Sequence, residues 1–160
     1  MSERFKGRKL LVVGGTSGMG METARMVLAE GGSVVLVGNR ADKAEEARQT
    51  LSALGPVEVI VANLSTDEGL QSLLKTLEAQ HADIDLLVNA AGVFFPKPFL
   101  EHTPDDYDLY MKFNRAIYFI TQKVAAQLVA AGRPGAIVNI GSTLPHRRRP
   151  IRWPRPACMR

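Results

Sequence analysis

The 160-residue sequence predicts an α/β domain, a doubly wound parallel sheet with helices on both faces. Short apolar runs rich in β-branched residues alternate along the chain with amphipathic stretches at helical spacing, which is the pattern of parallel βαβ units. The first apolar run also ends in a glycine-rich loop that leads directly into a helical stretch. That order is typical of the start of a nucleotide-binding βαβ unit.

The composition is that of one globular domain, with 46% hydrophobic residues and a single cysteine, Cys158. One cysteine excludes an internal disulfide and a cysteine-cluster metal site, and we expect no bound metal. No apolar run approaches the ~20 residues that cross a bilayer, so no membrane association is expected. The N-terminal residues MSERFKGRK lack the apolar core of a signal peptide, and we expect a cytoplasmic protein.

The net charge of +4 comes from the C-terminal end of the chain. Six arginines and no acid follow residue 146, whereas residues 1–146 hold 14 Lys and Arg against 16 Asp and Glu. The body of the chain therefore gives no electrostatic reason to expect nucleic acid as a partner. A nucleic-acid-binding arginine tail, with Trp153 as its stacking surface, is the least favoured reading.

The glycine-rich loop follows the first predicted strand, residues 10–13, and precedes a helix predicted over residues 21–31. Gly14 allows a sharp turn, Gly18 removes a Cβ where a pyrophosphate must come close, and Gly20 lets the helix pack against the strand. Unpaired N–H groups and the dipole at the helix start favour a phosphate. The residues expected around that phosphate are Gly14, Thr16, Ser17, Gly18, Met19 and Gly20.

The remaining elements follow in order. Strands are predicted over residues 33–37, 57–62, 84–88 and 136–140, and helices over residues 42–54, 67–80 and from Thr103 to about residue 131. Ser65 or Thr66 caps the third helix, Thr103 caps the fourth, and Gly132 ends it. Right-handed crossovers between these strands predict the strand order 3-2-1-4-5.

Residues 13–20, VGGTSGMG, resemble the TGxxxGxG fingerprint of the short-chain dehydrogenase/reductase family, with Val13 in place of the threonine. The match continues in Asn89, Ala90, Ala91 and Gly92, which resemble the family's NNAG motif, and it extends from Lys9 to about Leu144. The resemblance implies a Rossmann-like fold and NAD(P)-dependent hydride transfer to or from a small-molecule carbonyl or alcohol. The family is usually homo-oligomeric, although the elements that form its interface are largely missing from this chain.

The cofactor preference implied by the resemblance is NADP over NAD. An acid after the second strand binds the ribose 2′-hydroxyl of NAD, whereas this sequence has Gly38 there, followed by Asn39 and Arg40. Arg40 is alternatively a solvated residue at a helix start. The family's adenine-binding Asp corresponds to Asn63, followed by Leu64, and Asn63 is alternatively an ordinary turn residue.

The catalytic residues implied by the resemblance are Ser142, which orients the substrate carbonyl, and Asn114, which supports the proton relay. A plain strand-end serine and a polar residue on a solvated helix face are the alternatives. The family's tyrosine and lysine should follow Ser142, but the last tyrosine is Tyr118 and the last lysine is Lys123.

Residues 1–144 are thus predicted to form a dinucleotide-binding domain, incomplete on its C-terminal side, and residues 145–160 to form an Arg/Pro-rich tail outside the family pattern. Our hypothesis for the tail is a frameshift or sequencing error, because the bases from the end of the Ala157 codon into the Arg160 codon regroup to encode an apolar residue, Tyr or His, and Ala. We therefore expect an oxidoreductase chain that is inactive in this truncated form. The alternative is a non-enzymatic NAD(P)-binding module or sensor.

Overall fold

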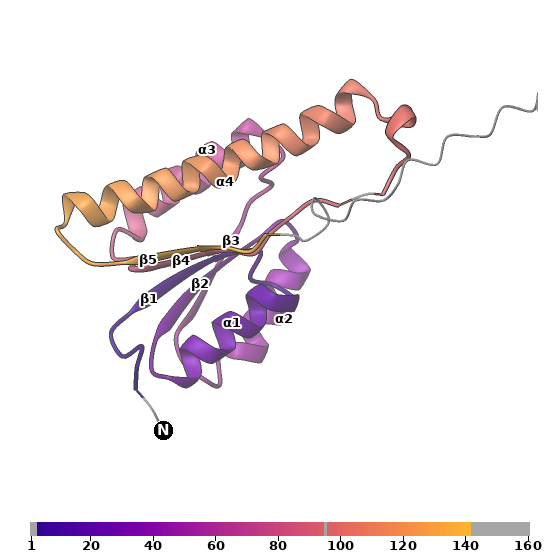
Figure 1. Cartoon of the computed structure of the whole chain (residues 1–160). Helices are drawn as coiled ribbons and strands as arrows, with labels where there is room; N and C mark the ends of the chain where they lie inside the picture. The colour runs from indigo at the N-terminus through magenta and orange to yellow at the C-terminus, as the bar shows by residue number, and fades with distance from the viewer. Residues whose placement is uncertain (1–2, 95, 142–160) are drawn as a thin grey trace, which may run out of the picture.

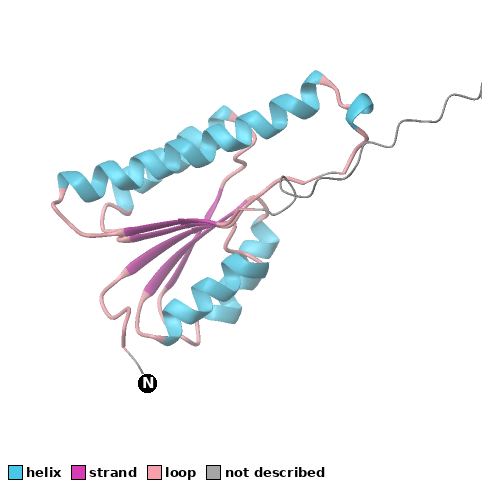
Figure 2. Ribbon diagram, viewed as in Figure 1, coloured by secondary structure: helices cyan, strands magenta, loops and turns pink. Residues whose placement is uncertain are grey.

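The computed structural model describes residues 3–94 and 96–141. Five parallel strands form one sheet in the order β3-β2-β1-β4-β5, which confirms the predicted fold class and strand order. Helices α3 and α4 lie on one face of the sheet, and α1 and α2 lie on the other (Figure 1). Figure 2 shows the same three layers by secondary structure.

The strands are β1 (Lys9–Val13), β2 (Ser33–Gly38), β3 (Val57–Val61), β4 (Leu86–Asn89) and β5 (Ala136–Asn139). The helices are α1 (Gly18–Ala29), α2 (Ala41–Leu51), α3 (Asp67–Gln80) and α4 (Pro104–Ala130), with a short 3₁₀ turn at Phe99–Glu101. Every predicted strand and helix is present, and only the boundaries move.

Strand β4 runs from Leu86 to Asn89 rather than over residues 84–88, other strand ends shift by one residue, and two helix boundaries were predicted wrongly by three residues. Helix α1 begins at Gly18 rather than at residue 21, because the last part of the glycine loop already forms the first helical turn. Helix α2 ends at Leu51 rather than at residue 54, since Leu51 is its last buried apolar side chain and Leu54 is 43% exposed.

The central strands β1, β2 and β4 are buried on both faces of the sheet, and successive residues of β1 alternate between two cores. Leu11 and Val13 pack with α3 and α4, whereas Leu10 and Val12 pack with α1 and α2. All four are at most 1% exposed, as is typical of a central parallel strand covered by helices on both sides.

The threonines predicted to cap helices do so. Thr66 caps α3 by accepting a hydrogen bond from the Gly69 amide at 3.1 Å. Thr103 and Asp106 form a reciprocal capping box at the start of α4. Hydrogen bonds from Lys97 and from the Thr103 amide lower the pKa of Asp106 to about 2. Gly132, at φ +60°, ends α4.

The connection from α4 to β5 is fastened by one ion pair. Arg133 donates to Asp85 Oδ1 at 2.9 Å and to the carbonyl oxygen of Asp83 at 2.9 Å. Asp85 is 5% exposed and also accepts from the backbone amide of Lys9 at 3.3 Å. Arg133 therefore joins the amino ends of β1, β4 and β5.

The described helices include none that is both long and apolar enough to cross a bilayer. The cytoplasmic location stays a prediction. The predicted tail at residues 145–160 lies outside the described residues, and so does Ser142.

We expect Arg133→Ala to lower the free energy of unfolding by roughly 2–4 kcal/mol, because it leaves the Asp85 carboxylate buried without its main cationic partner. Urea denaturation followed by circular dichroism measures the change. Arg25→Ala is the control, since Arg25 lies on the surface of α1 and, among the described residues, pairs only with Glu22 on the same helix. Equal urea midpoints for the two variants would show that the Arg133–Asp85 ion pair does not stabilise the fold.

Candidate functional site

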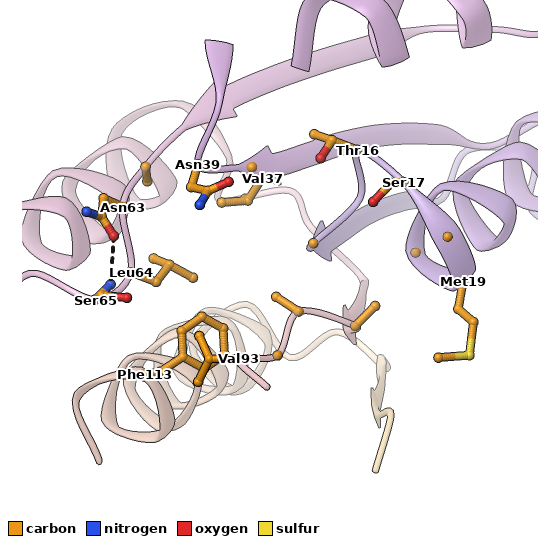
Figure 3. A pocket seen from close by; sticks show the side chains of 18 residues that line it. Thr16, Ser17, Met19, Val37, Asn39, Asn63, Leu64, Ser65, Val93 and Phe113 are labelled. Carbon is orange, nitrogen blue, oxygen red and sulfur yellow. Dashed lines mark hydrogen bonds between the residues drawn. The ribbon is translucent and has the colours of Figure 1, made fainter. Parts of the chain in front are cut away.

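A cavity of about 430 Å³ lies at the carboxyl ends of the strands, between β2 and β4, where the chain order reverses across β1 (Figure 3). Crevices of this kind are the usual ligand sites of doubly wound sheets. Its walls come from the loops after β1, β2, β3 and β4 and from α4. They are formed by Gly14, Thr16, Ser17, Gly18, Met19, Gly20, Val37, Gly38, Asn39, Ala62, Asn63, Leu64, Ser65, Ala90, Ala91, Gly92, Val93 and Phe113.

The glycine loop is packed so closely that side chains are excluded at two of its positions, Gly14 and Gly20. Gly14 has φ +82°, and a Cβ there would lie 2.6 Å from the Ala91 amide nitrogen. A Cβ on Gly20 would lie 2.2 Å from the Gly14 carbonyl oxygen. Both distances are far below van der Waals contact, so the start of α1 and the loop after β4 can meet only with glycine at these positions.

The N-terminus of α1 faces this cavity and has no side-chain cap among residues 3–94 and 96–141. The Ser17 side chain makes no capping hydrogen bond, and the first turn of α1 contains no acid. Helices α3 and α4 instead carry a capping threonine and acids in the first turn. At Gly18, a Cβ would meet nothing within 4 Å, so the space above this helix start is open. The loop thus offers an anion unpaired N–H groups and the positive end of a helix dipole.

The loop after β3 forms the far end of the cavity. Asn63 Oδ1 accepts from the Ser65 amide at 3.0 Å, a turn of the Asx type (Figure 3). Leu64 is 6% exposed and provides an apolar wall. Phe113 and Val93 lie across the cavity from Thr16 and Asn39.

Arg40 is the one predicted cofactor residue after β2 that does not line the cavity. Its guanidinium donates to the Asp42 carboxylate at 2.6 Å at the start of α2, and this hydrogen bond lowers the pKa of Asp42. Asn39 lines the cavity instead.

Asn89 also stays outside the main cavity. Its Nδ2 donates to Asn139 Oδ1 at 2.7 Å and to Thr121 Oγ1 at 3.0 Å, and the residue is 4% exposed. These bonds tie the carboxyl ends of β4 and β5 to α4. Asn89 therefore supports the backbone of Ala90, Ala91 and Gly92, which line the cavity.

A second cavity, of about 310 Å³, adjoins the first and shares part of its wall, including Ala91 and Phe113. Its polar side chains are Asn89, Asn114, Asn139 and Tyr110. Asn114 lies one helical turn after Tyr110 on α4. Both residues line this second cavity, which lies next to the carboxyl end of β5. In the part of the chain that the structure describes, no group of three or more His, Cys, Asp or Glu side chains is placed to hold a metal ion.

Sequence reasoning identified the loops of the site but not all of its walls. The lining residues not assigned as cofactor-binding are Val37, Gly38, Ala62, Ser65, Val93 and Phe113. Phe113 directly precedes Asn114 in the long helix, and Val93 directly follows the Asn89–Gly92 motif. Their position next to motif residues was the signal in the sequence that they line the cavity. Apolar side chains at these positions are, however, equally expected to belong to the core.

Comparisons with known proteins agree with this geometry. Bovine (Bos taurus) L-xylulose reductase is 36% identical over 144 residues, which cover 89% of this chain and 56% of the relative. The NADP-dependent (R)-specific alcohol dehydrogenase of Lentilactobacillus kefiri is 27% identical and is covered to 57%. The crystal structure of a metagenomic short-chain oxidoreductase in complex with NADP superposes with a TM-score of 0.78 at 30% identity, covering 86% of this chain and 63% of that one.

The chain spans about half the length of the curated relatives that it matches. The sequence profile described as short chain dehydrogenase matches residues 8–152, which is most of the chain. The chain belongs to the short-chain dehydrogenase family.

Proposed function

We propose that the chain binds a nicotinamide dinucleotide, NADP in preference to NAD, in the cavity at the carboxyl ends of the strands. The observation that carries this proposal is the uncapped N-terminus of α1, which opens into a cavity beside a loop where only glycine fits at positions 14 and 20. The adenosine half would lie toward the ends of β2 and β3, where Asn39, Asn63 and Leu64 provide polar groups and an apolar wall. The NADP-bound relative and the NADP-dependent relative support the choice of cofactor.

The pyrophosphate would lie against Ser17, Gly18 and Gly20, and the nicotinamide would reach past Gly92 toward the second cavity. The dinucleotide supplies or accepts the hydride, and the substrate class is a small molecule with a carbonyl or alcohol carbon. Asn114 lies in the second cavity, where it can hydrogen-bond a substrate or a water. Ser142 follows β5 closely in the sequence and is proposed to orient the substrate carbonyl.

The 160 residues lack the tyrosine and lysine that the family resemblance leads us to expect as the acid/base of this chemistry. Neither a tyrosine nor a lysine follows Ser142. Tyr107 and Tyr118 are 62% and 64% exposed on α4, and only Tyr110 lines the second cavity. We therefore propose that this polypeptide binds the cofactor without family-like turnover, which is also how a binding module or sensor would behave.

We expect Gly18→Val to abolish NADP binding, because the new side chain projects into the open space above the start of α1. Gly132→Val is the matched control, since Gly18 and Gly132 have similar positive φ values, +54° and +60°, and a Cβ on either meets nothing within 4 Å. Each variant should lose about 1–2 kcal/mol of stability from backbone strain. Calorimetric titration with NADP should show normal affinity for Gly132→Val alone, and unchanged affinity for Gly18→Val would refute the site.

We expect the parent chain to bind NADP about tenfold to a hundredfold more tightly than NAD, the value of charge-assisted hydrogen bonds to the 2′-phosphate. Arg40 can leave its exposed ion pair with Asp42 to reach that phosphate. Arg40→Ala should therefore reduce the ratio of NADP affinity to NAD affinity. Arg25→Ala should leave it unchanged. Equal affinities for NADP and NAD in the parent chain would contradict this prediction.

We expect no NADPH oxidation by the purified 160-residue polypeptide above about 10⁻² of the rate of a full-length relative assayed alongside, because positioned proton transfer contributes ~10²–10⁴ in rate. Carbonyl substrates of several sizes should be tested. If residual activity is found, Tyr110→Phe shows whether the Tyr110 hydroxyl transfers the proton. Only activity that depends on that hydroxyl would be lost in the variant. Turnover at the rate of the relative would overturn the proposal.

A further inference from the structure

His81 is a buried histidine at the amino end of the sheet, opposite the cavity. It ends α3 as its C-cap, and its backbone amide donates to the Leu77 carbonyl oxygen at 3.2 Å. Leu77 before it and Ile84 after it are both 0% exposed and belong to the core between the sheet, α3 and α4. The His81 side chain is itself only 3% exposed. The imidazole therefore lies inside the protein, at the point where α3 turns back toward β4.

Three charged side chains face this imidazole from three separate segments: Lys9 of β1, Glu58 of β3 and Asp83 of the loop before β4. The Lys9 ammonium pairs with the Glu58 carboxylate at 3.1 Å and with the Asp83 carboxylate at 3.3 Å. The shortest distance from His81 Nδ1 to Glu58 is 4.0 Å, which is too long for a hydrogen bond. Both carboxylates are therefore engaged by Lys9 rather than by His81.

On the α4 side, the neighbouring groups are the uncharged Gln127 and the cation Arg133. Gln127 Nε2 donates to the same Leu77 carbonyl oxygen as the His81 amide. Its Oε1 makes no hydrogen bond in the described part of the chain, so it is not an acceptor that His81 uses. Arg133 donates to the carbonyl oxygen of Ala82, the residue after His81. Neither group accepts a proton from the imidazole.

The Nδ1 atom of His81 is buried and has no hydrogen-bond partner among residues 3–94 and 96–141. A neutral imidazole with its proton on Nε2 tolerates this, because Nδ1 is then only an acceptor. Protonation would place a second donor at Nδ1, where it has no acceptor, and would bury a charge. Burial and, after it, the charge of Lys9 lower the pKa of His81, and Glu58 and Asp83 oppose this only in part.

We infer that His81 is an acid-sensitive latch: its neutral imidazole holds the carboxyl end of α3 on the core, and protonation of the imidazole releases that end. An unfolded chain takes up this proton at the ordinary pKa of histidine, whereas the folded chain takes it up only at lower pH. The stability that the latch contributes is therefore present above the ordinary pKa and is lost as the pH falls below it. This role is independent of the proposed dinucleotide site, since His81 lines neither cavity.

Urea denaturation of the full chain from about pH 7.5 to about pH 5.5 covers the range in which histidines titrate and carboxylates stay ionised. The urea midpoint of the parent chain should fall across this range. His81→Phe keeps an aromatic ring that cannot be protonated, so its midpoint should change little with pH. His102→Gln is the matched control, because His102 is 32% exposed beside the start of α4, and its midpoint should fall as that of the parent does.

Hydrogen exchange, corrected for the pH dependence of the exchange chemistry, shows where the protein opens. On acidification of the parent chain, the amides of the last turn of α3 and of His81 should lose more protection than the amides of β1. The same amides should keep their protection in His81→Phe. An equal loss of protection over α3 and β1 in the parent would overturn the local release.

Nuclear magnetic resonance titration of the parent chain tests the latch even if His81→Phe fails to fold. The ring signals of His81 should titrate below the ordinary range of histidine, and titration within or above that range would overturn the inference. Equal pH dependence of the urea midpoint in the parent and in His81→Phe would also overturn it. So would a pH dependence that disappears in His102→Gln, because the titrating group would then be His102.

Discussion

The structure depends on the pairing of β1 with β4, which closes the sheet across the point where the chain order reverses. Leu10–Val13 of β1 pair with Leu86–Asn89 in unbroken parallel register, while the other edge of β1 pairs with β2. Because every side chain of that run is buried, β1 contributes to both cores. The loops that follow β1 and β4 emerge side by side from this pairing, and they come so close that only glycine fits at position 14. The cavity is the space that remains between these two loops and the ends of β2 and β3.

The outer strand β5 is held differently. All four of its residues are exposed, including Ile137 and Val138, so burial contributes little to its position. Polar contacts fix it at both ends instead. Arg133 and Asp85 join its amino end to β4, and Asn89 and Asn139 join its carboxyl end. The second cavity and Asn114 lie beside the Asn89–Asn139 end, so the part of the site next to β5 is positioned by hydrogen bonds rather than by packing.

The sequence was sufficient to predict the strands and the loops that line the cavity, because those features depend on local patterns: apolar runs, capping threonines and glycines at turn positions. The strand order then follows from right-handed crossovers between the predicted strands. What it could not reveal depends on contacts between distant segments. Asn89 begins the segment that resembles the family's NNAG motif, yet its amide is turned away to Asn139 and Thr121, residues far along the chain. Arg40 follows β2 as expected but pairs with Asp42. The wall formed by Phe113 likewise arises only when separate segments meet.

The β1–β4 pairing also has a consequence for the order of folding. The hydrogen bond between the Lys9 amide and Asp85 closes a loop of 76 residues, whereas that between Ser33 and Arg8 closes one of 25. Closing the longer loop costs about 1 kcal/mol more in chain entropy. The β1-β2-β3 half can therefore assemble first, and β4 docks onto it afterwards. Since the cavity has walls from both halves, it exists only after that docking step. A bound nucleotide would then slow unfolding and leave the early folding rate nearly unchanged.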